Sequence, residues 1–291
     1  MRYRLRLLIH YSFARPSGGG RQLLRIRPAD LAGVQRVISA EVKVTPPPAE
    51  QREFRDFFGT TVDEVVMPPG LKEISFELKA KVERTSAGHG LDISPALGRL
   101  SGEIAGQRSL WAEAPHHYLP RSPRIPQVPD IATFAREAAA GAGTAREAVE
   151  KLGLALNKAM TFDANATEVD TPIAAAFAGR EGVCQDFSQI MIAGLRALGI
   201  PSAYVAGFLR TLPPPGRKRL VGADAMHAWV RAWTGSDGAW VEYDPTNACF
   251  VGQDHIVMGY GRDYSDVAPV TGMLRLESSQ RGRHSVDIVE Y

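Results

Sequence analysis

The sequence predicts an α+β protein, in which an N-terminal antiparallel β-sandwich is followed by a domain with a helix packed on an antiparallel sheet. Three observations lead to this class. Apolar and polar residues alternate with a period of two in the first 85 residues, prolines dominate the next segment, and helical periodicity begins only after residue 129. We therefore expect a sandwich domain at 1–85, a Pro-rich linker at 86–129 and a second domain at 130–291.

The N-terminal region carries the strand pattern most clearly in residues 2–13, where only Leu8 interrupts the alternation. Such alternation is typical of a strand with one buried and one wet face. A glycine-rich loop at 16–20 leads to an expected strand around Leu23–Arg27, and another alternating strand covers Ile74–Val82. Several short strands without a convincing helix favour a small sandwich.

The middle of the chain changes character. Five prolines within residues 115–129 predict an extended linker, because proline prevents both helix and sheet pairing. Helices are expected directly after it. Asp130 can cap an apolar segment, and Thr144 with Glu147 forms a capping-box pattern ahead of another apolar run.

The clearest helix lies between Gly182 and Pro201. Its apolar side chains recur at i, i+3, i+4, i+7, i+8 and i+11, which makes one continuous stripe. Gly199 ends the pattern, and Cys184 lies in the opening turn. Strands are expected after this helix at Ala203–Leu209, Ala225–Trp233 and Ala239–Tyr243.

Composition narrows the function classes. Of the 291 residues 44% are hydrophobic and 23% charged, the balance of a protein that buries a core. A formal net charge of +2 gives no global reason to expect a nucleic-acid or membrane partner. No run approaches the roughly 18 apolar residues of a membrane span, and the first residues lack a signal peptide's apolar region, so we expect a cytoplasmic protein. Cys184 and Cys249 are then expected to be free thiols.

Cys184 lies where a thiol can become reactive. Only the thiolate is nucleophilic, and both the positive end of a helix dipole and a nearby imidazolium lower the pKa of a cysteine thiol. The first turn of the expected helix supplies the first of these influences. A buried structural cysteine is the alternative, and it is the commoner role of a lone cysteine.

A predicted hairpin supplies the second influence. If Thr234–Asp237 form a four-residue turn, His227 lies opposite Asp244 with β-carbons about 5 Å apart. The carboxylate would then fix the tautomer of the ring and favour its charged form. A loop one residue longer would weaken this match, and a surface His–Asp pair is the alternative. Asp224, just before the histidine strand, is the next candidate to orient the ring, although a turn residue is the simpler interpretation.

A metal site is the alternative to this arrangement. Cys249 and His255 are close enough in sequence to suggest ligands that join His227, but their spacing fits no common zinc pattern. We therefore expect no metal and no cofactor.

Four segments of the second domain follow one another in a specific order: Gly182–Phe187, Arg196–Pro201, His227–Trp229 and Asp244–Asn247. Their order and spacing resemble the transglutaminase-like superfamily of thiol enzymes. Residues Gly261–Pro269 resemble its bacterial branch, and His10-Tyr11 with Phe54–Asp56 resembles the N-terminal domain of that branch. The resemblance implies a papain-like α+β core with Cys184 as nucleophile, His227 as base and acid, and Asp244 as orienting carboxylate.

The donor to the oxyanion departs from the family pattern. Eukaryotic cross-linking members use a tryptophan upstream of the cysteine, whereas here Trp111 lies in the expected linker and Phe162 is the nearer aromatic residue. The backbone N–H of Cys184 is the first candidate donor, and the Gln185 side chain is a weaker second one. Gln185 could equally be a solvated residue at the helix start. Asp186 is expected to be a first-turn carboxylate that favours the helix dipole.

The expected reaction is acyl transfer at an amide bond of a peptide or protein substrate through a thioester. We favour a cysteine peptidase or amidase, because water captures the acyl group unless a dry site and a bound amine exclude it. A protein-glutamine acyltransferase, that is a transglutaminase, is one alternative. A non-catalytic protein-binding module with the same fold is another.

Overall fold

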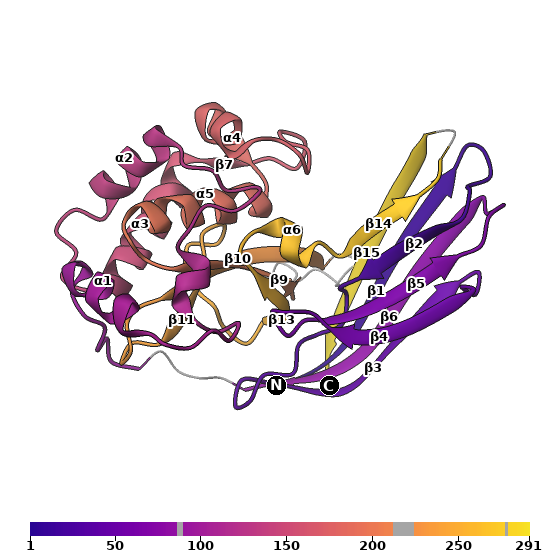
Figure 1. The fold of residues 1–291 in the computed structure, drawn as a ribbon, viewed down its shortest axis with the longest axis horizontal. Coiled ribbons are helices and arrows are strands. Elements are labelled where there is room, and N and C mark those ends of the chain that lie inside the picture. Colours follow the sequence, from indigo (N-terminus) through magenta and orange to yellow (C-terminus); the bar gives the residue numbers. More distant parts are fainter. Residues whose placement is uncertain (86–89, 212–223, 277–278) are drawn as a thin grey trace, which may run out of the picture.

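The computed structural model describes residues 1–85, 90–211, 224–276 and 279–291, which form a helical lobe and an elongated all-β lobe (Figure 1). This arrangement confirms the predicted α+β class. Among the described residues, no helix is long and apolar enough to cross a membrane.

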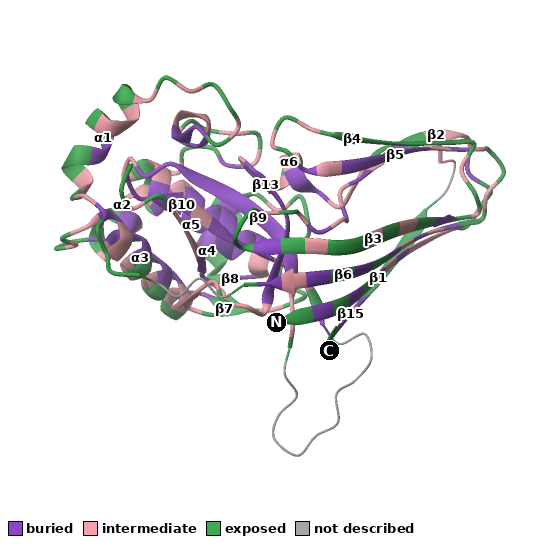
Figure 2. Ribbon diagram, turned by 90° about the horizontal axis from the view of Figure 1, so that it is seen from below, coloured by how far each residue is buried: buried purple, intermediate pink, exposed green. Residues whose placement is uncertain are grey.

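The all-β lobe consists of two four-stranded antiparallel sheets, which lie as two layers in Figure 2. One sheet has the order β15-β1-β6-β3, with the bounds β1 (Arg2–Phe13), β3 (Gln35–Thr45), β6 (Glu73–Arg84) and β15 (Gln280–Glu290). The other has the order β14-β2-β5-β4, with the bounds β2 (Gly20–Leu24), β4 (Glu50–Arg55), β5 (Thr61–Met67) and β14 (Val270–Leu274). The alternation in β1 has the predicted effect, because Tyr3, Leu5 and Leu7 are buried while the arginines between them are exposed.

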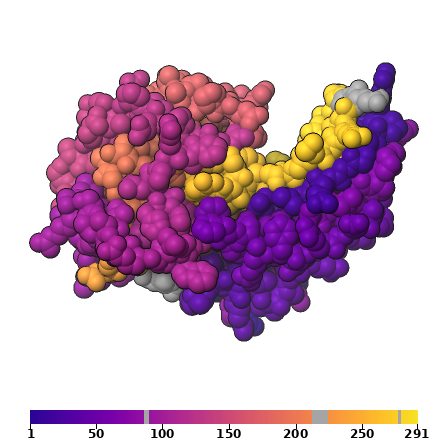
Figure 3. All heavy atoms as spheres, viewed as in Figure 1, coloured from indigo at the N-terminus to yellow at the C-terminus, as the bar shows by residue number. Residues whose placement is uncertain are grey.

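The C-terminal strands correct the expected domain division. Residues 130–291 were expected to form one domain, but β15 pairs with β1 from Tyr3↔Glu290 to Phe13↔Gln280, and β14 pairs with β2. Both therefore complete the N-terminal sheets, and Figures 1 and 3 show the yellow C-terminal residues beside the indigo N-terminal ones. The residues of β15 do not indicate a half-buried strand clearly, because only Val286 and Ile288 in it are buried.

The expected linker also contains regular structure. Helix α1 (Leu97–Gly106) and the short 3₁₀ helix η1 (Pro115–Tyr118) lie within residues 86–129. The proline cluster starts only at Pro115, so nothing prevents a helix before it. At Pro115 the ring occupies the first position of η1, where a missing N–H costs nothing.

The helical lobe contains a five-stranded antiparallel sheet of order β12-β11-β10-β9-β13, with two helices packed on it and two more packed against these helices. The helices are α2 (Pro129–Ala138), α3 (Ala145–Ala159), α4 (Ile173–Gly179) and α5 (Cys184–Ala197). The strands are β9 (Ser202–Leu209), β10 (Ala225–Trp233), β11 (Trp240–Asp244), β12 (Cys249–Phe250) and β13 (His255–Gly261). The remaining elements are the strands β7 (Thr161–Phe162) and β8 (Glu181–Gly182), which pair in parallel, and the short helix α6 (Tyr264–Val267).

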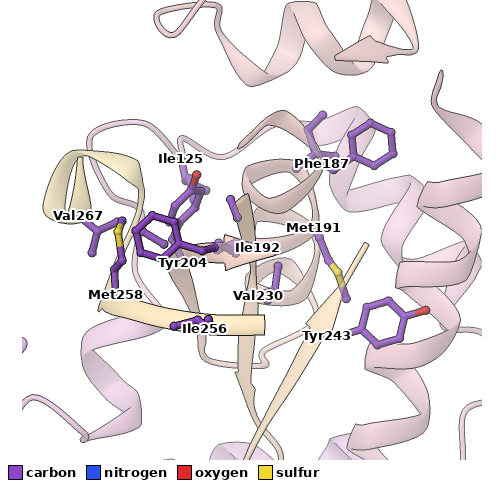
Figure 4. Packing of buried hydrophobic residues seen from close by; sticks show 14 of the residues in the cluster. Ile125, Phe187, Met191, Ile192, Tyr204, Val230, Tyr243, Ile256, Met258 and Val267 are labelled. Atoms are coloured by element: carbon purple, nitrogen blue, oxygen red, sulfur yellow. The ribbon is translucent and has the colours of Figure 1, made fainter. Parts of the chain in front are cut away.

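Helix α5 is the centre of this lobe. Between Gln185 and Leu195 every residue except Ala193 is buried. Figure 4 shows Met191 and Ile192 on the side of the helix that faces the sheet. The predicted helix is therefore confirmed, but it is surrounded by protein on more than its apolar stripe.

The two faces of the five-stranded sheet contribute to different clusters of buried hydrophobic side chains. Alternate residues such as Ala228 and Val230 join the core under α5, whereas Trp229 packs with Val205 and Val257 on the opposite face. Gln35 of the β-sandwich joins this second face, because its amide donates to the Val257 carbonyl at 2.8 Å and accepts from the Val257 N–H at 2.9 Å. A buried two-way hydrogen bond of this kind holds the lobes in a fixed relation.

We expect replacement of Leu195 by Ala to lower the free energy of unfolding by about 2–5 kcal/mol, because the side chain is fully buried and leaves a cavity. Urea unfolding measures the effect. Leu154→Ala on α3 is the matched control, since that leucine is exposed and its loss should cost under about 1 kcal/mol. Equal losses in the two variants would contradict the packing described for α5.

Candidate active site

The opening turn of α5 positions Cys184. Asp186 is fully buried, and its Oδ2 accepts the Val183 N–H at 2.9 Å and the Thr167 hydroxyl at 2.6 Å. Gly182 leaves the room for this carboxylate, since a β-carbon there would lie 2.7 Å from Oδ2. The expected first-turn position of Asp186 is thus observed, and its hydrogen bonds fix the backbone directly before the cysteine.

Cys184 is half-buried and lies on a cleft of about 420 Å³ that His227 also lines. The N–H groups of Cys184 and Gln185 are the first of the helix, with no preceding turn to accept their hydrogens. They point the positive end of the helix dipole to the same region. The thiol is therefore accessible from the cleft at the N-terminal end of α5.

The hairpin that carries His227 has a different register from the predicted one. Trp233 pairs with Trp240 rather than with Gly238, because the loop spans residues 234–239 and not four residues. Ala239 makes the longer loop possible by adopting a left-handed conformation, with φ 52°. The observed pairing differs from the predicted one by two residues, so each side chain keeps its predicted face of the sheet. Asp244 follows Tyr243, the last residue of β11 that pairs with β10, and reaches His227 diagonally.

The predicted contact between His227 and Asp244 is present. Nε2 of the ring lies 2.7 Å from Oδ2 of the carboxylate, and the histidine side chain is only 7% exposed. The Cys184 side chain lines the same cleft as the ring and contributes to the electrostatics of His227. The structure therefore brings the three predicted side chains of Cys184, His227 and Asp244 together at one end of the sheet.

Asp244 is fully buried and receives hydrogen bonds at both oxygens. Oδ1 accepts the N–H groups of Thr246 and Asn247 at 2.9 and 3.2 Å. Oδ2 accepts the Asn247 side-chain amide at 2.7 Å in addition to the His227 ring. Burial favours the neutral acid, but these bonds, with that from His255, outweigh it and hold the pKa of Asp244 well below its usual range.

His255 is a site residue whose position the sequence did not reveal. Its Nε2 lies 3.0 Å from the same Oδ2 of Asp244. The ligand-type atoms of His227, Asp244 and His255 all lie within 4.8 Å of one another, as in a metal site. The Gly252 N–H donates to Nδ1 of His255 at 3.3 Å, however, so the ring proton lies on Nε2 and points at the carboxylate. Hydrogen bonding alone accounts for the cluster.

The charged form of His227 is favoured. Burial alone would lower its pKa, but hydrogen bonds with Asp244 and Cys184, and the charges of both, raise the pKa to about 10. Burial, and then the charge of Asp244, raise the pKa of Cys249, whereas a reactive thiol has a lowered pKa. The two cysteines thus lie in different electrostatic surroundings.

The other expected residues have clear positions. Gln185 is buried rather than solvated, and its amide donates to the Val169 carbonyl at 2.9 Å beside Cys184. Asp224 accepts the backbone N–H groups of Thr211 and Ile288. Trp111 is 82% exposed and is absent from the residues that line the cleft.

The raised pKa of His227 predicts a pH-dependent contribution to stability. A group with a folded pKa above its unfolded value of 6.5 stabilises fully below that value, and the contribution is lost as pH rises through about 10. The stability difference between the wild type and His227→Gln should therefore be largest near about pH 6 and shrink toward about pH 10. Urea unfolding at both pH values measures it, with His116→Gln in η1 as the control. A pH-independent difference would contradict the charged pair.

Two family models match the chain. Residues 132–245 match the transglutaminase-like superfamily, and residues 3–83 match the bacterial transglutaminase-like N-terminal region. The first match includes Cys184, His227 and Asp244, and the second covers most of the sandwich strands.

Several bacterial proteins are similar to part of this chain in sequence. An uncharacterised protein of Mycobacterium tuberculosis is 43% identical over 135 residues, which cover 45% of this chain and 43% of that protein. The chain thus spans less than half the length of the mycobacterial relatives that it matches. A protein-glutamine gamma-glutamyltransferase of Pseudomonas aeruginosa is 38% identical over 89 residues, which cover 30% of this chain and 13% of that enzyme.

Among solved structures, a candidate cysteine protease from Cytophaga hutchinsonii aligns with 99% of this chain and 90% of its own. The TM-score is 0.75 at 20% sequence identity, so the two proteins share the fold. The sequence motifs and the two family matches agree on a transglutaminase-like core at residues 132–245, preceded by a bacterial transglutaminase-like N-terminal region at residues 3–83.

Proposed function

We propose that this protein is a thiol enzyme that cleaves amide bonds through a thioester, as a cysteine peptidase or amidase. The observation that carries the proposal is the position of the His227 ring, which lines one cleft with Cys184 and hydrogen-bonds to the buried carboxylate of Asp244. Nucleophile, base and orienting group are the three parts that covalent acyl transfer requires.

The reaction takes place in two steps. The Cys184 thiolate forms a C–S bond with the amide carbon, the C–N bond breaks, and the imidazolium of His227 gives its proton to the departing amine. His227 then takes a proton from water, whose oxygen attacks the thioester and releases the acid and the thiolate. Asp244 keeps the ring oriented in both steps. The Cys184 N–H at the helix start is the natural donor to the oxyanion.

The cleft supports a peptide or protein as substrate. Much of its wall is apolar, with Ile9, Tyr11, Tyr204, Met226, Met258 and Val270 among the lining residues. These come from both lobes, and the space-filling view is hollowed between the helical lobe and the C-terminal strands (Figure 3). An open apolar groove with a few polar groups suits an extended chain better than a small polar molecule.

Transamidation is the second candidate. The similarity to a protein-glutamine gamma-glutamyltransferase favours it, and the chemistry differs only in that an amine rather than water attacks the thioester. Incubation of a glutamine-rich protein with a fluorescent primary amine separates the two outcomes. Incorporated label indicates transamidation, and free carboxylate with released ammonia indicates hydrolysis.

Thiol reactivity tests the proposal directly. Iodoacetamide should modify Cys184 at about pH 6 at least tenfold faster than Cys249, because only the former has an imidazolium beside it. Mass spectrometry of tryptic peptides measures both rates in one sample. His227→Ala should remove the difference. Two equally slow thiols in the wild type would favour the binding-module interpretation instead.

Asp244→Asn should lower turnover by roughly 10²–10⁴-fold while the thiol remains, because the amide permits the wrong ring tautomer and withdraws charge from the imidazolium. The pH at which alkylation of Cys184 reaches half its maximal rate should rise in the same variant. Asp224→Asn is the control, since that carboxylate accepts backbone N–H groups of Thr211 and Ile288. If Asp224→Asn has the larger effect, Asp244 is not the orienting group.

A further inference from the structure

His255 occupies a place in the site that the proposed mechanism does not use. It begins the edge strand β13, next to β9, and only 5% of it is exposed. Its Nε2 lies 3.0 Å from Oδ2 of Asp244, the oxygen that also accepts the His227 ring at 2.7 Å. Two histidines from different strands thus share one carboxylate oxygen.

The hydrogen bonds of His255 fix which nitrogen carries its proton. The Gly252 backbone N–H can only donate, and it points to Nδ1 at 3.3 Å. Nδ1 must therefore offer a lone pair, so the proton lies on Nε2 and is donated to Asp244. The ring edge is further held by a T-shaped contact with Trp229, with centroids 5.2 Å apart and an interplanar angle of 79°.

Further hydrogen bonds hold the Trp229 ring that contacts His255. Trp229 is itself fixed, since it is fully buried and its indole N–H donates to Glu242 Oε2 at 2.7 Å. Glu242 also accepts the Tyr260 hydroxyl at 2.8 Å. Among the described residues, the charged groups on this side include Asp244, the His227 ring, whose centroid lies 6.1 Å from that of His255, and Glu242 with the neighbouring Arg231.

We propose that His255 is a positioning residue, which holds the carboxylate of Asp244 in the rotamer that faces His227 and keeps it available as a hydrogen-bond acceptor. This inference rests on the proposed function, because it concerns the same triad. The Asn247 side-chain amide also donates to Oδ2, at 2.7 Å, and two backbone N–H groups donate to Oδ1. His255 is the donor that approaches Oδ2 from β13, across the sheet from the hairpin.

The test compares two substitutions at this position. His255→Leu removes the donor and keeps an apolar side chain, whereas His255→Gln keeps an N–H at a similar reach. The rate of iodoacetamide alkylation of Cys184 at about pH 6.5 should fall about tenfold in His255→Leu, the effect of one hydrogen bond to a charged group. His255→Gln should retain the rate within about threefold. His116→Leu, in η1, is the control and should leave the rate unchanged.

The pH profile separates positioning from a merely structural role. His255→Leu should shift the alkylation profile of Cys184 to higher pH, and His255→Gln should restore it, after thermal unfolding has shown that both variants are folded. A lower melting temperature with an unchanged profile, or equal losses in both variants, overturns the proposal. A wild-type Cys184 no faster than Cys249 would instead contradict the proposed function itself.

One measurement needs no variant. Nitrogen NMR of the histidine rings in the wild type should find His255 with its proton on Nε2 and an unprotonated Nδ1. A proton on Nδ1 overturns the proposal even if His255→Leu fails to fold.

Discussion

The buried carboxylate of Asp244 is the constraint on which the site depends. A fully buried charge costs several kcal/mol unless hydrogen bonds and an opposite charge compensate for it. Here the compensation comes from the turn after β11, through Thr246 and Asn247, and from the rings of His227 and His255. The carboxylate, at the end of β11, therefore connects β10 and β13 through its hydrogen bonds with His227 and His255, and these bonds fix how the strand ends lie.

The same constraint extends to a glycine of β9, Gly207. Gly207 lies opposite His227 in the ladder between β9 and β10, and a β-carbon on it would lie 2.3 Å from the Trp229 ring. The indole can lie across β9 only because that β-carbon is missing. Trp229 in turn contacts His255, so a residue without a side chain on β9 supports the carboxylate indirectly.

Much of the site could be predicted because its elements are local. The stripe of α5 and the dipole at Cys184 need only the 3.6-residue period, and the face of His227 needs only the parity of the strand. The loop length was wrong by two residues, and parity made the error harmless. The position of His255 could not be found in this way, since β13 pairs with β9 across a bulge between Val257 and Gly259. Strands β14 and β15 were missed for a similar reason, because they pair with residues 246 to 287 positions away.

The electrostatics decide the order of proton transfers in the proposed reaction. With a pKa near 10, the His227 ring holds its proton at neutral pH before any substrate binds. The first task of the ring is therefore that of an acid toward the departing amine. Only after this transfer does His227 become a base for water. In such an enzyme it matters more that His227 stays protonated until the amine departs than that its neutral ring is a strong base. The Asp244 carboxylate, hydrogen-bonded to both histidines, favours this protonated form.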